Sequence, residues 1–359
     1  MINLVRRRCQ FCTSGRRSRR TTIAKAVLKQ KRLSYALICV LTSLAGMTYL
    51  ANRESEYDNI ETHALQPTSL RSRCSYVGFE IPKALTGVGN NLFYYSAVMY
   101  VAWLTGRRPC FSANTYLETV FDVDIPHLKD INAFNCPMYK FYLKTTGEYD
   151  RRVESLTHIN ETTFLLLKGH FQSWKYVEPI ASQLRQRLRF RQDLINFVVN
   201  FLAKSVPRGW TTLKFVRVGV HVRRGDFLNK KWRSMGLTTA SERYLQRAMS
   251  YFVERFPRVQ FIVASNDILW CQDHMKFSMF NKTNVKVSFS VGHNTGQDLA
   301  LLASCDHTVM TTGTYSWWAA WLANGTTIYY ANYPKPNSRL DVAVRKHDYY
   351  CPKWIGIDD

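Results

Sequence analysis

Residues 218–226 read Val-Gly-Val-His-Val-Arg-Arg-Gly-Asp, and this stretch decides the fold of the second half of the chain. Valines at every second position from 216 to 222 predict a buried β-strand. Gly225 lets the chain leave that strand by a sharp turn. Because open α/β sheets bind ligands at the carboxyl ends of their strands, the sequence predicts a ligand site directly after residue 222.

Two neighbouring arginines, Arg223 and Arg224, stand at this strand end. Arginine is seldom buried without an anionic partner, and its planar guanidinium forms paired hydrogen bonds with phosphate groups. The pair therefore indicates a phosphate or pyrophosphate ligand. An alternative interpretation is that the arginines form ion pairs with carboxylates of the protein itself, such as Asp226.

The formal net charge of +23 is concentrated at the N-terminus. Residues 1–32 carry 11 Lys and Arg side chains and no acid, and residues 33–50 follow as 18 residues without a charge. A membrane-spanning helix needs about 17–25 such residues, and the positive-inside rule places the preceding basic segment in the cytosol. A nucleic-acid binder is disfavoured because the charge lies beside this segment and not on a folded face.

We therefore expect a cytosolic tail at 1–32, a signal-anchor transmembrane helix at 33–50 and a polar stem at 51–73. A cleaved signal peptide normally has a shorter basic region and a small-residue cleavage site, and a buried core helix would not follow such a basic block. A span this short suits a thin Golgi membrane. The prediction is a single-pass type II Golgi membrane protein whose larger, C-terminal part is lumenal.

The cysteines agree with that topology. Six lie beyond the predicted span, at Cys74, Cys110, Cys136, Cys271, Cys305 and Cys351. They allow up to three disulfides whose pairing stays open, and Cys305, inside an apolar helical pattern, equally fits a buried thiol. Three glycosylation sequons, beginning at residues 160, 281 and 324, lie on the predicted lumenal side and also favour a glycoprotein of the secretory pathway.

From residue 213 onward, predicted strands and helices alternate. The strands are expected at 214–222, 259–265, 285–290, 307–312 and 326–331, and the helices at 240–256, 267–280, 297–304 and 315–323. This alternation predicts a parallel sheet with right-handed crossovers, so the second half is Rossmann-like. The first half, with helical patterns at about 90–106 and 176–204, is expected to be a second α/β domain facing it across a cleft.

Further segments follow predicted strands or begin helices. They are Ser265-Asn266-Asp267, the stretch 297–302, the stretch 311–318 and the glycine turn 86–91. The Gly, Thr and Ser residues of 311–318 stand where a helix start exposes backbone N–H groups to an anion. Asp298 equally fits a first-turn acid that complements the helix dipole. Trp317, Trp318 and Trp321 favour core packing over stacking on a base.

Together these segments resemble the inverting α-1,2-fucosyltransferase family over roughly residues 78–350. The motif at 218–226 is typical of the α-1,2-, α-1,6- and protein-O-fucosyltransferases. Four segments narrow the resemblance to the α-1,2 branch: Arg243-Tyr244-Leu245, Ser265-Asn266-Asp267 with Trp270-Cys271, residues 298–302, and residues 313–318 with Trp321. Asn91 and Phe227 depart from the family, which usually has Gln and often Tyr there, and these departures concern acceptor fit.

The resemblance implies a two-domain GT-B fold, with an acceptor-side domain at 74–210 and a domain at 211–359 that binds GDP-fucose without a divalent metal. The implied reaction moves L-fucose to the 2-hydroxyl of a terminal galactose with inversion. Arg223 or Arg224 would hold the pyrophosphate and stabilise the charge of departing GDP. His221 would line the nucleotide pocket and Asp298 would contact the guanosine. The other implied donor contacts are Gly313, Thr314 and Ser316 in the C-terminal half, and Gly87, Gly89 and Asn90 in the N-terminal half.

Three questions stay open in the sequence. Asp226 is the nearest general base, but it would equally orient Arg223, and a dissociative reaction needs little base assistance. Asp122-x-Asp124 looks like the metal-binding motif of other transferases, although a surface turn is expected there. Transfer at another position, transfer to a protein hydroxyl and a non-catalytic lectin-like relative remain alternatives. Both arginines and the Gly/Thr/Ser turn are intact, which disfavours the last.

Overall fold

The computed structural model describes residues 74–79, 87–111, 116–123, 127, 136–210 and 212–359. The predicted tail, membrane span and stem therefore lie outside the described residues. Within the described part, no helix is long and apolar enough to cross a membrane. Residues Ser69–Asp359 form one compact unit, which contains both sheets.

The first sheet has four parallel strands in the order β2-β1-β4-β3. They are β1 (Tyr76–Phe79), β2 (Arg108–Pro109), β3 (Met138–Tyr142) and β4 (Phe164–Lys168). Helix α2 (Val88–Thr105) follows β1 and packs against it, and it ends at Gly106 in the left-handed conformation (φ 68°) that glycine favours. Almost every residue of α2 from Val88 to Ala102 is buried, as expected of a helix that is apolar on all sides.

Within this sheet, the 3₁₀ turn Tyr116–Thr119 lies between β2 and β3, and the turn Arg151–His158 lies between β3 and β4. Two more 3₁₀ turns, Trp174–Tyr176 and Glu178–Ile180, and the helices α3 (Ala181–Arg187) and α4 (Gln192–Ser205) connect this sheet to the second one. Helix α4 packs against α8 of the second half. The first half is therefore α/β, as the sequence predicts.

The second sheet has six parallel strands in the order β10-β9-β8-β5-β6-β7. The strands are β5 (Val216–Val222), β6 (Val259–Ser265), β7 (Val285–Phe289), β8 (His307–Met310), β9 (Thr327–Tyr330) and β10 (Ile355–Ile357). The helices are α5 (Lys230–Met235), α6 (Glu242–Arg255), α7 (Ile268–His274), α8 (Thr295–Ala303), α9 (Gly313–Ala323), α10 (Arg339–Ala343) and α11 (Lys346–Tyr349), with 3₁₀ turns at Gly225–Leu228 and Ser278–Asn281. Two parallel sheets confirm the predicted α/β class.

The strand order reverses between β5 and β8. From β5 the chain steps outward through β6 to β7, then returns to the other side of β5 and continues through β8 and β9 to β10. The two strands pair in parallel register, with His221 opposite Met310 at their carboxyl ends. Ligands of open α/β sheets bind at such a reversal, so a ligand-binding site is expected between the carboxyl ends of β5 and β8.

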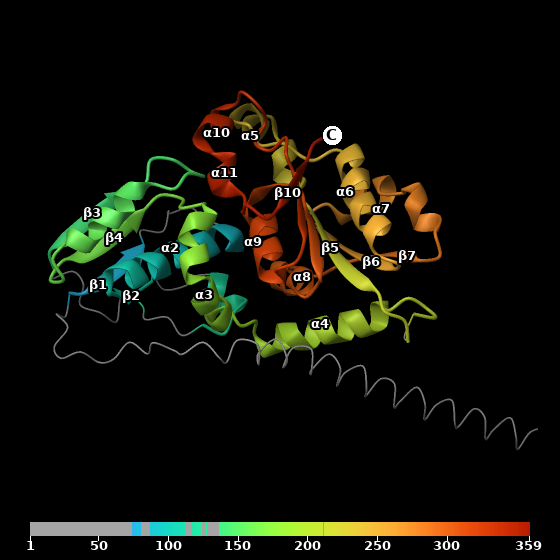
Figure 1. The fold of residues 1–359 in the computed structure, drawn as a ribbon, viewed down its shortest axis with the longest axis horizontal. Coiled ribbons are helices and arrows are strands. Elements are labelled where there is room, and N and C mark those ends of the chain that lie inside the picture. The colour runs from blue at the N-terminus through green and yellow to red at the C-terminus, as the bar shows by residue number, and fades with distance from the viewer. Residues whose placement is uncertain (1–73, 80–86, 112–115, 124–126, 128–135, 211) are drawn as a thin grey trace, which may run out of the picture. The chain divides into compact units, whose positions relative to one another are not determined.

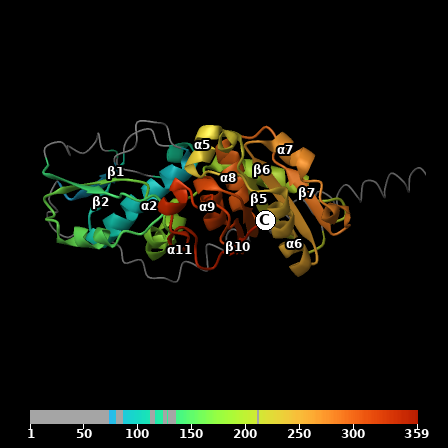
Figure 2. The same cartoon turned by 90° about the horizontal axis from the view of Figure 1, so that it is seen from above.

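The tryptophans of α9 confirm the core-packing prediction. Trp317 and Trp318 are fully buried, and their ring centroids lie 4.8 Å and 5.2 Å from the ring of Phe93 on α2. Helix α9 lies between the two sheets (Figure 1), and the view from above agrees (Figure 2). One hydrophobic cluster thus contains residues of both halves.

Most predicted element positions agree with the structure, and helix α7 is the main difference. The sequence predicts a helix at 267–280, but α7 ends at His274 and a 3₁₀ turn forms separately at Ser278–Asn281. Buried Met275, Phe277 and Met279 pack into the second core cluster along this segment. Strand β10 has no counterpart among the predictions because it is only three residues long.

The described cysteines form one disulfide, between Cys74 and Cys136. It joins the residues that precede β1 and β3. Cys305 is a buried thiol, as one of the two sequence interpretations predicts, and burial raises the pKa of Cys305 to about 12. Cys110 and Cys271 are likewise buried thiols.

Candidate active site

The turn that carries the arginine pair is held by the ends of both neighbouring strands. The backbone N–H of Arg223 donates to Thr311 Oγ1 (2.9 Å), and that of Arg224 donates to Asn266 Oδ1 (2.9 Å). Gly225 has φ +38°, and a Cβ there would lie 2.1 Å from the Asn266 side-chain nitrogen. The segments predicted at 218–226, 265–267 and 311–318 therefore meet at one edge of the sheet.

Each guanidinium has one carboxylate and one aromatic partner. Arg223 Nη2 lies 2.7 Å from Asp226 Oδ1, and its guanidinium carbon lies 5.2 Å from the centre of the Phe227 ring. Arg224 Nε donates to Asp267 Oδ2 (3.2 Å), and its guanidinium carbon lies 3.7 Å from the Trp270 ring. The local ion pairs of the alternative interpretation are thus present.

These ion pairs leave most N–H donors of each guanidinium available to a ligand. A guanidinium has five N–H donors in a planar fork, and the described side chains use Nη2 of Arg223 and Nε of Arg224. The carboxylates and rings fix the orientation of the two planes. A bound anion would meet guanidiniums that are already positioned, which lowers the entropy lost on binding.

Asp226 is the exposed partner in the Arg223 pair. Its carboxylate is half exposed, and its backbone carbonyl accepts from the Asn229 N–H (3.0 Å). The structure places Asp226 where it orients Arg223, which is one of the roles that the sequence leaves open.

His221 is buried at the end of β5 and bonds to Ser316. Ser316 Oγ donates to the Thr312 carbonyl (3.0 Å) and lies 2.5 Å from His221 Nδ1. A serine hydroxyl has a single proton, and since Ser316 gives it to the Thr312 carbonyl, we assign His221 Nδ1–H as the donor to Ser316. Burial, together with the positive charge of Arg223, lowers the pKa of His221 to about 3, and the imidazole is neutral. Ser316 is fully buried and its described hydrogen bonds go to Thr312 and His221, so it does not face the anion site as the resemblance implies.

The first turns of α2 and α9 are in direct contact. A Cβ on Gly89 would lie 2.6 Å from both Thr314 C and Tyr315 N, so only glycine allows this approach. Thr314 Oγ1 donates to Asn90 Oδ1 (2.9 Å), and Gln172 Nε2 donates to the same oxygen (3.2 Å). The predicted residues of the glycine turn and of the 311–318 segment therefore lie together, although 224 residues separate Asn90 from Thr314.

Both of these helix starts favour an anion. Among the described residues no side chain caps either helix, and neither first turn contains an acid. Thr312 Oγ1, at the N-cap of α9, is buried and has no hydrogen-bond partner in the described part of the chain. Uncapped helix N-termini present free N–H groups and a partial positive charge, and here two of them meet.

Gly87 and Gly313 differ in their surroundings and in their backbone conformation. Gly87 is exposed at the N-cap of α2, and no atom lies within 4 Å of where its Cβ would stand. Gly313 has φ +87°, a left-handed conformation that permits the sharp turn from β8 into α9. Gly87 thus borders open space, and Gly313 shapes the helix start.

Asp298 lies in the first turn of α8, as the sequence predicts, but the helix does not need it as a cap. Asn294 and Gln297 already form a capping box there. Asp298 Oδ1 instead accepts from Ser290 Oγ (2.5 Å), and burial raises the pKa of the Asp298 carboxyl. Ser290 and His293 are not among the predicted site residues; their only signal in the sequence is that Ser290 ends the predicted strand at 285–290 and His293 follows three residues later.

Asp122 is exposed and its N–H donates to the Arg189 carbonyl (2.7 Å), while Asp124 lies outside the described residues. Asp122 lines a small cavity of about 230 Å³ with Tyr95, Val123, Gln186, Arg187 and Arg189. The neighbouring arginines are cations, which repel a divalent metal ion. Asp122 therefore has the surroundings of a surface turn.

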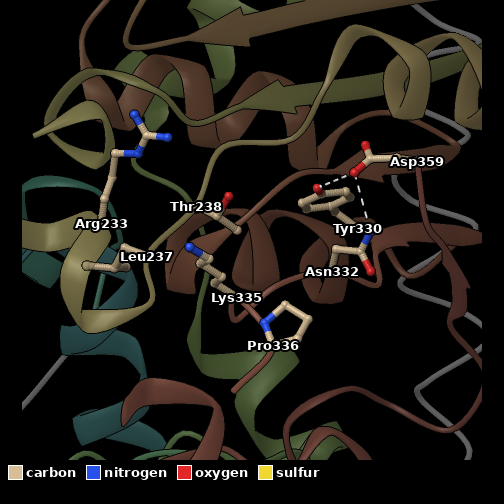
Figure 3. Close-up of a pocket in the computed structure, with 8 residues that line it drawn as sticks. All are labelled: Arg233, Leu237, Thr238, Tyr330, Asn332, Lys335, Pro336 and Asp359. Carbon is tan, nitrogen blue, oxygen red and sulfur yellow. Dashed lines mark hydrogen bonds between the residues drawn. The ribbon is translucent and has the colours of Figure 1, made fainter. Parts of the chain in front are cut away.

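A second cavity, of about 310 Å³, lies at the carboxyl end of β9 (Figure 3). It is lined by Arg233, Leu237, Thr238, Tyr330, Asn332, Lys335, Pro336 and Asp359. Tyr330 and Asn332 both donate to Asp359 Oδ2 in this view. None of the predicted site residues lines it, so the strand and helix ends at β5 and β8 define the candidate site.

The comparisons with known proteins agree with this geometry. The family model described as "Glycosyl transferase family 11" matches residues 74–358. The chain belongs to this family. Galactoside alpha-(1,2)-fucosyltransferase 2 of Bos taurus is 30% identical over 311 residues, which cover 83% of this chain and 86% of that protein. Galactoside alpha-(1,2)-fucosyltransferase 1 of Rattus norvegicus is 31% identical over 277 residues, 75% of this chain and 70% of that protein.

Among solved structures, a mutant of Arabidopsis thaliana FUT1 in complex with GDP is similar, with a TM-score of 0.51 and 12% identity. The match covers 80% of this chain and 78% of that one. At this identity the likeness concerns the fold alone. The family matches confirm the resemblance stated from the motifs at 218–226 and 298–321.

His221 is expected to stay neutral over the range in which an ordinary histidine titrates, about pH 5–8. NMR of a ring-labelled protein, with His221→Asn to identify the signal, should show a constant shift over this range. The same signal in the urea-unfolded protein should titrate near about 6.5. Because the unfolded state takes up a proton that the folded state refuses, His221 should reduce stability as the pH falls below that value. A folded-state midpoint within the range would contradict the buried, neutral assignment.

Proposed function

We propose that this chain transfers L-fucose from GDP-fucose to the 2-hydroxyl of a terminal galactose, or of a similar sugar, with inversion at the fucose anomeric carbon. Membership of glycosyl transferase family 11 and the galactoside alpha-(1,2)-fucosyltransferase relatives support this reaction. The observation that carries it is the meeting of two uncapped helix starts beside two oriented arginines. This arrangement suits a diphosphate.

The pyrophosphate of the donor would lie against Arg223, Arg224 and the first turns of α2 and α9. As the bond from fucose to phosphate breaks, GDP gains negative charge, and these fixed positive groups stabilise it in the transition state. The groups need no reorientation, because carboxylates, rings and helix packing already hold them. We propose on this ground that the reaction needs no divalent metal.

His221 would line the nucleotide pocket as a neutral group. With Nδ1–H donated to Ser316, its Nε2 is an acceptor for a hydroxyl of the donor. The Tyr315 ring lies 4.7 Å from the imidazole, and the Tyr315 hydroxyl donates to the Thr295 carbonyl at the start of α8 (2.8 Å). A nucleotide could therefore extend from His221 along Tyr315 toward Asp298, which would contact the guanosine.

Asp226 in this proposal orients Arg223, because its carboxylate is paired with that guanidinium. The acceptor hydroxyl then loses its proton late, to a phosphate oxygen of the departing GDP, after most of the bond from fucose to that phosphate has broken. Catalysis comes mainly from stabilising the leaving group. This agrees with a dissociative reaction that needs little assistance from a base.

We also propose that the chain is a type II Golgi membrane protein anchored by residues 33–50, with the catalytic part in the lumen. The basic segment before this apolar stretch supports the orientation. A disulfide between Cys74 and Cys136 suits an oxidising compartment. Asn160, Asn281 and Asn324 of the three sequons are all exposed, as glycosylation would require.

The function is tested by incubating the purified protein with GDP-fucose and a panel of β-galactoside, other glycan and protein acceptors. We expect fucose on galactose, released by a linkage-specific α-1,2-fucosidase, at an undiminished rate in EDTA. Fucose on another position or on a protein hydroxyl would replace the proposed acceptor. Strict dependence on added Mn²⁺ would contradict metal independence and return Asp122 and Asp124 to consideration. GDP-fucose binding without any transfer would favour the lectin-like alternative.

Arg224→Lys should reduce turnover by roughly 100- to 1,000-fold while the protein stays folded, because lysine cannot present a planar fork to the pyrophosphate. Arg255→Lys is the matched control. Arg255 also stacks on an aromatic ring, 3.6 Å from the centre of Tyr251, and pairs with Glu254, but it lies at the exposed end of α6. Equal activity of the two variants would remove Arg224 from the pyrophosphate site.

Gly89→Ala should weaken GDP binding about tenfold, because a methyl group there pushes the starts of α2 and α9 apart and separates their positive ends. Gly87→Ala is the control, since its Cβ would meet nothing within 4 Å and its φ is −63°. Calorimetry measures the GDP affinities, and thermal melting checks that both variants are folded. Unchanged affinity in a folded Gly89→Ala protein would show that the helix contact does not build the anion site.

A further inference from the structure

A polar chain of three side chains lies at the end of β7, away from the arginine pair. His293 Nδ1 lies 2.6 Å from Ser290 Oγ, and Ser290 Oγ lies 2.5 Å from Asp298 Oδ1. Ser290 is 3% exposed. Ser290 Oγ takes part in both hydrogen bonds but has only one proton, so it donates in one of them and accepts in the other.

That proton belongs to the bond with Asp298. Ser290 Oγ–H donates to Asp298 Oδ1, and His293 Nδ1–H must therefore donate to Ser290 Oγ. The histidine is itself fixed by aromatic rings of α4: its ring centroid lies 4.6 Å from that of Phe197 and 5.6 Å from that of Phe201. Two donors in series thus hold one oxygen of the Asp298 carboxylate from the side of α4 and β7.

The second carboxylate oxygen of Asp298, Oδ2, is the one that a ligand would contact. The hydrogen bonds of the described residues engage Oδ1, and Asp298 is only partly buried. Tyr315 of α9 interacts electrostatically with Asp298, its hydroxyl donates to the Thr295 carbonyl at the start of α8, and its ring lies against His221. Asp298 therefore lies at one end of a row of side chains that begins at the anion site.

A carboxylate in this place can distinguish purine bases. Guanine presents N–H donors at N1 and at the 2-amino group along one edge, whereas adenine presents an acceptor at N1 on the same edge. A fixed carboxylate oxygen accepts from guanine and repels the adenine nitrogen. Such discrimination requires the carboxylate to be held in place, because a mobile side chain turns away from the wrong base.

We propose that Ser290 and His293 are positioning residues that hold Asp298 against the guanine edge of the donor, and that they thereby set the preference of the site for guanosine over adenosine diphosphate. This inference rests on the proposed GDP-fucose function. The partial burial of Asp298 adds to the need for Ser290, because a carboxylate that is partly removed from water stays ionised more readily when it accepts a hydrogen bond.

The test measures the affinities of the whole protein for GDP, inosine diphosphate and ADP by calorimetry. Ser290→Ala is expected to lower the GDP affinity about tenfold and to leave ADP binding unchanged, so that the ratio of the two affinities falls. The affinity for inosine diphosphate, which lacks the 2-amino group, should fall less in Ser290→Ala than the affinity for GDP. Arg224→Lys should instead weaken all three nucleotides alike, because it acts on the shared diphosphate.

Two variants of His293 separate positioning from packing. His293→Phe fills the space between Phe197 and Phe201 but has no N–H for Ser290, and it should lower the ratio of GDP to ADP affinity. His293→Asn restores a donor near the position of Nδ1 and should recover part of that ratio. A merely structural role would make both variants lose stability without changing the ratio.

The outcomes separate the two proposals. If the unaltered protein does not bind GDP, the proposed function fails and the inference fails with it. If the unaltered protein prefers GDP to ADP, and Ser290→Ala is folded and keeps the same ratio, the inference alone is overturned. A folded Ser290→Ala protein with a reduced ratio supports it.

Discussion

The site depends on the contact between the first turns of α2 and α9. Gly89 allows the two backbones to touch, and Asn90 accepts hydrogen bonds from Thr314 and Gln172 across the junction. Buried rings behind it, Trp317 and Trp318 against Phe93, keep the helices together. Since both helices start at this contact without side-chain caps among the described residues, their positive ends add at one point. Core packing thus creates the electrostatics of the site.

The arginines add oriented N–H donors to this region, although each of them pairs with one carboxylate. Asp226 and Asp267 each engage one edge of a guanidinium, and Phe227 and Trp270 support the planes. Partly exposed ion pairs of this kind contribute little to stability, so their effect is mainly one of orientation. An arginine whose direction is fixed before the substrate arrives loses less entropy on binding.

Two serines determine which atoms donate and which accept in the hydrogen bonds of His221 and His293 near the proposed nucleotide site. Ser316 donates its single proton to Thr312, which makes His221 the donor in the next bond. Ser290 donates to Asp298, which makes His293 the donor in the next bond. In both places one hydroxyl proton determines which atom of the neighbouring functional group remains available for a ligand. Such chains are specific because a buried polar group without a partner is costly.

The sequence by itself determined the parallel sheet of the second half, because strands of valine and isoleucine alternate with helices at a spacing that only crossover connections satisfy. It also indicated the arginine pair and a helix that follows the 311–314 turn, since strand ends and glycine turns are local patterns. Only the tertiary structure brought Asn90 to Thr314, paired Cys74 with Cys136, and joined Ser290 and His293 to Asp298. These contacts depend on how distant or differently directed elements pack, and no local spacing encodes that geometry.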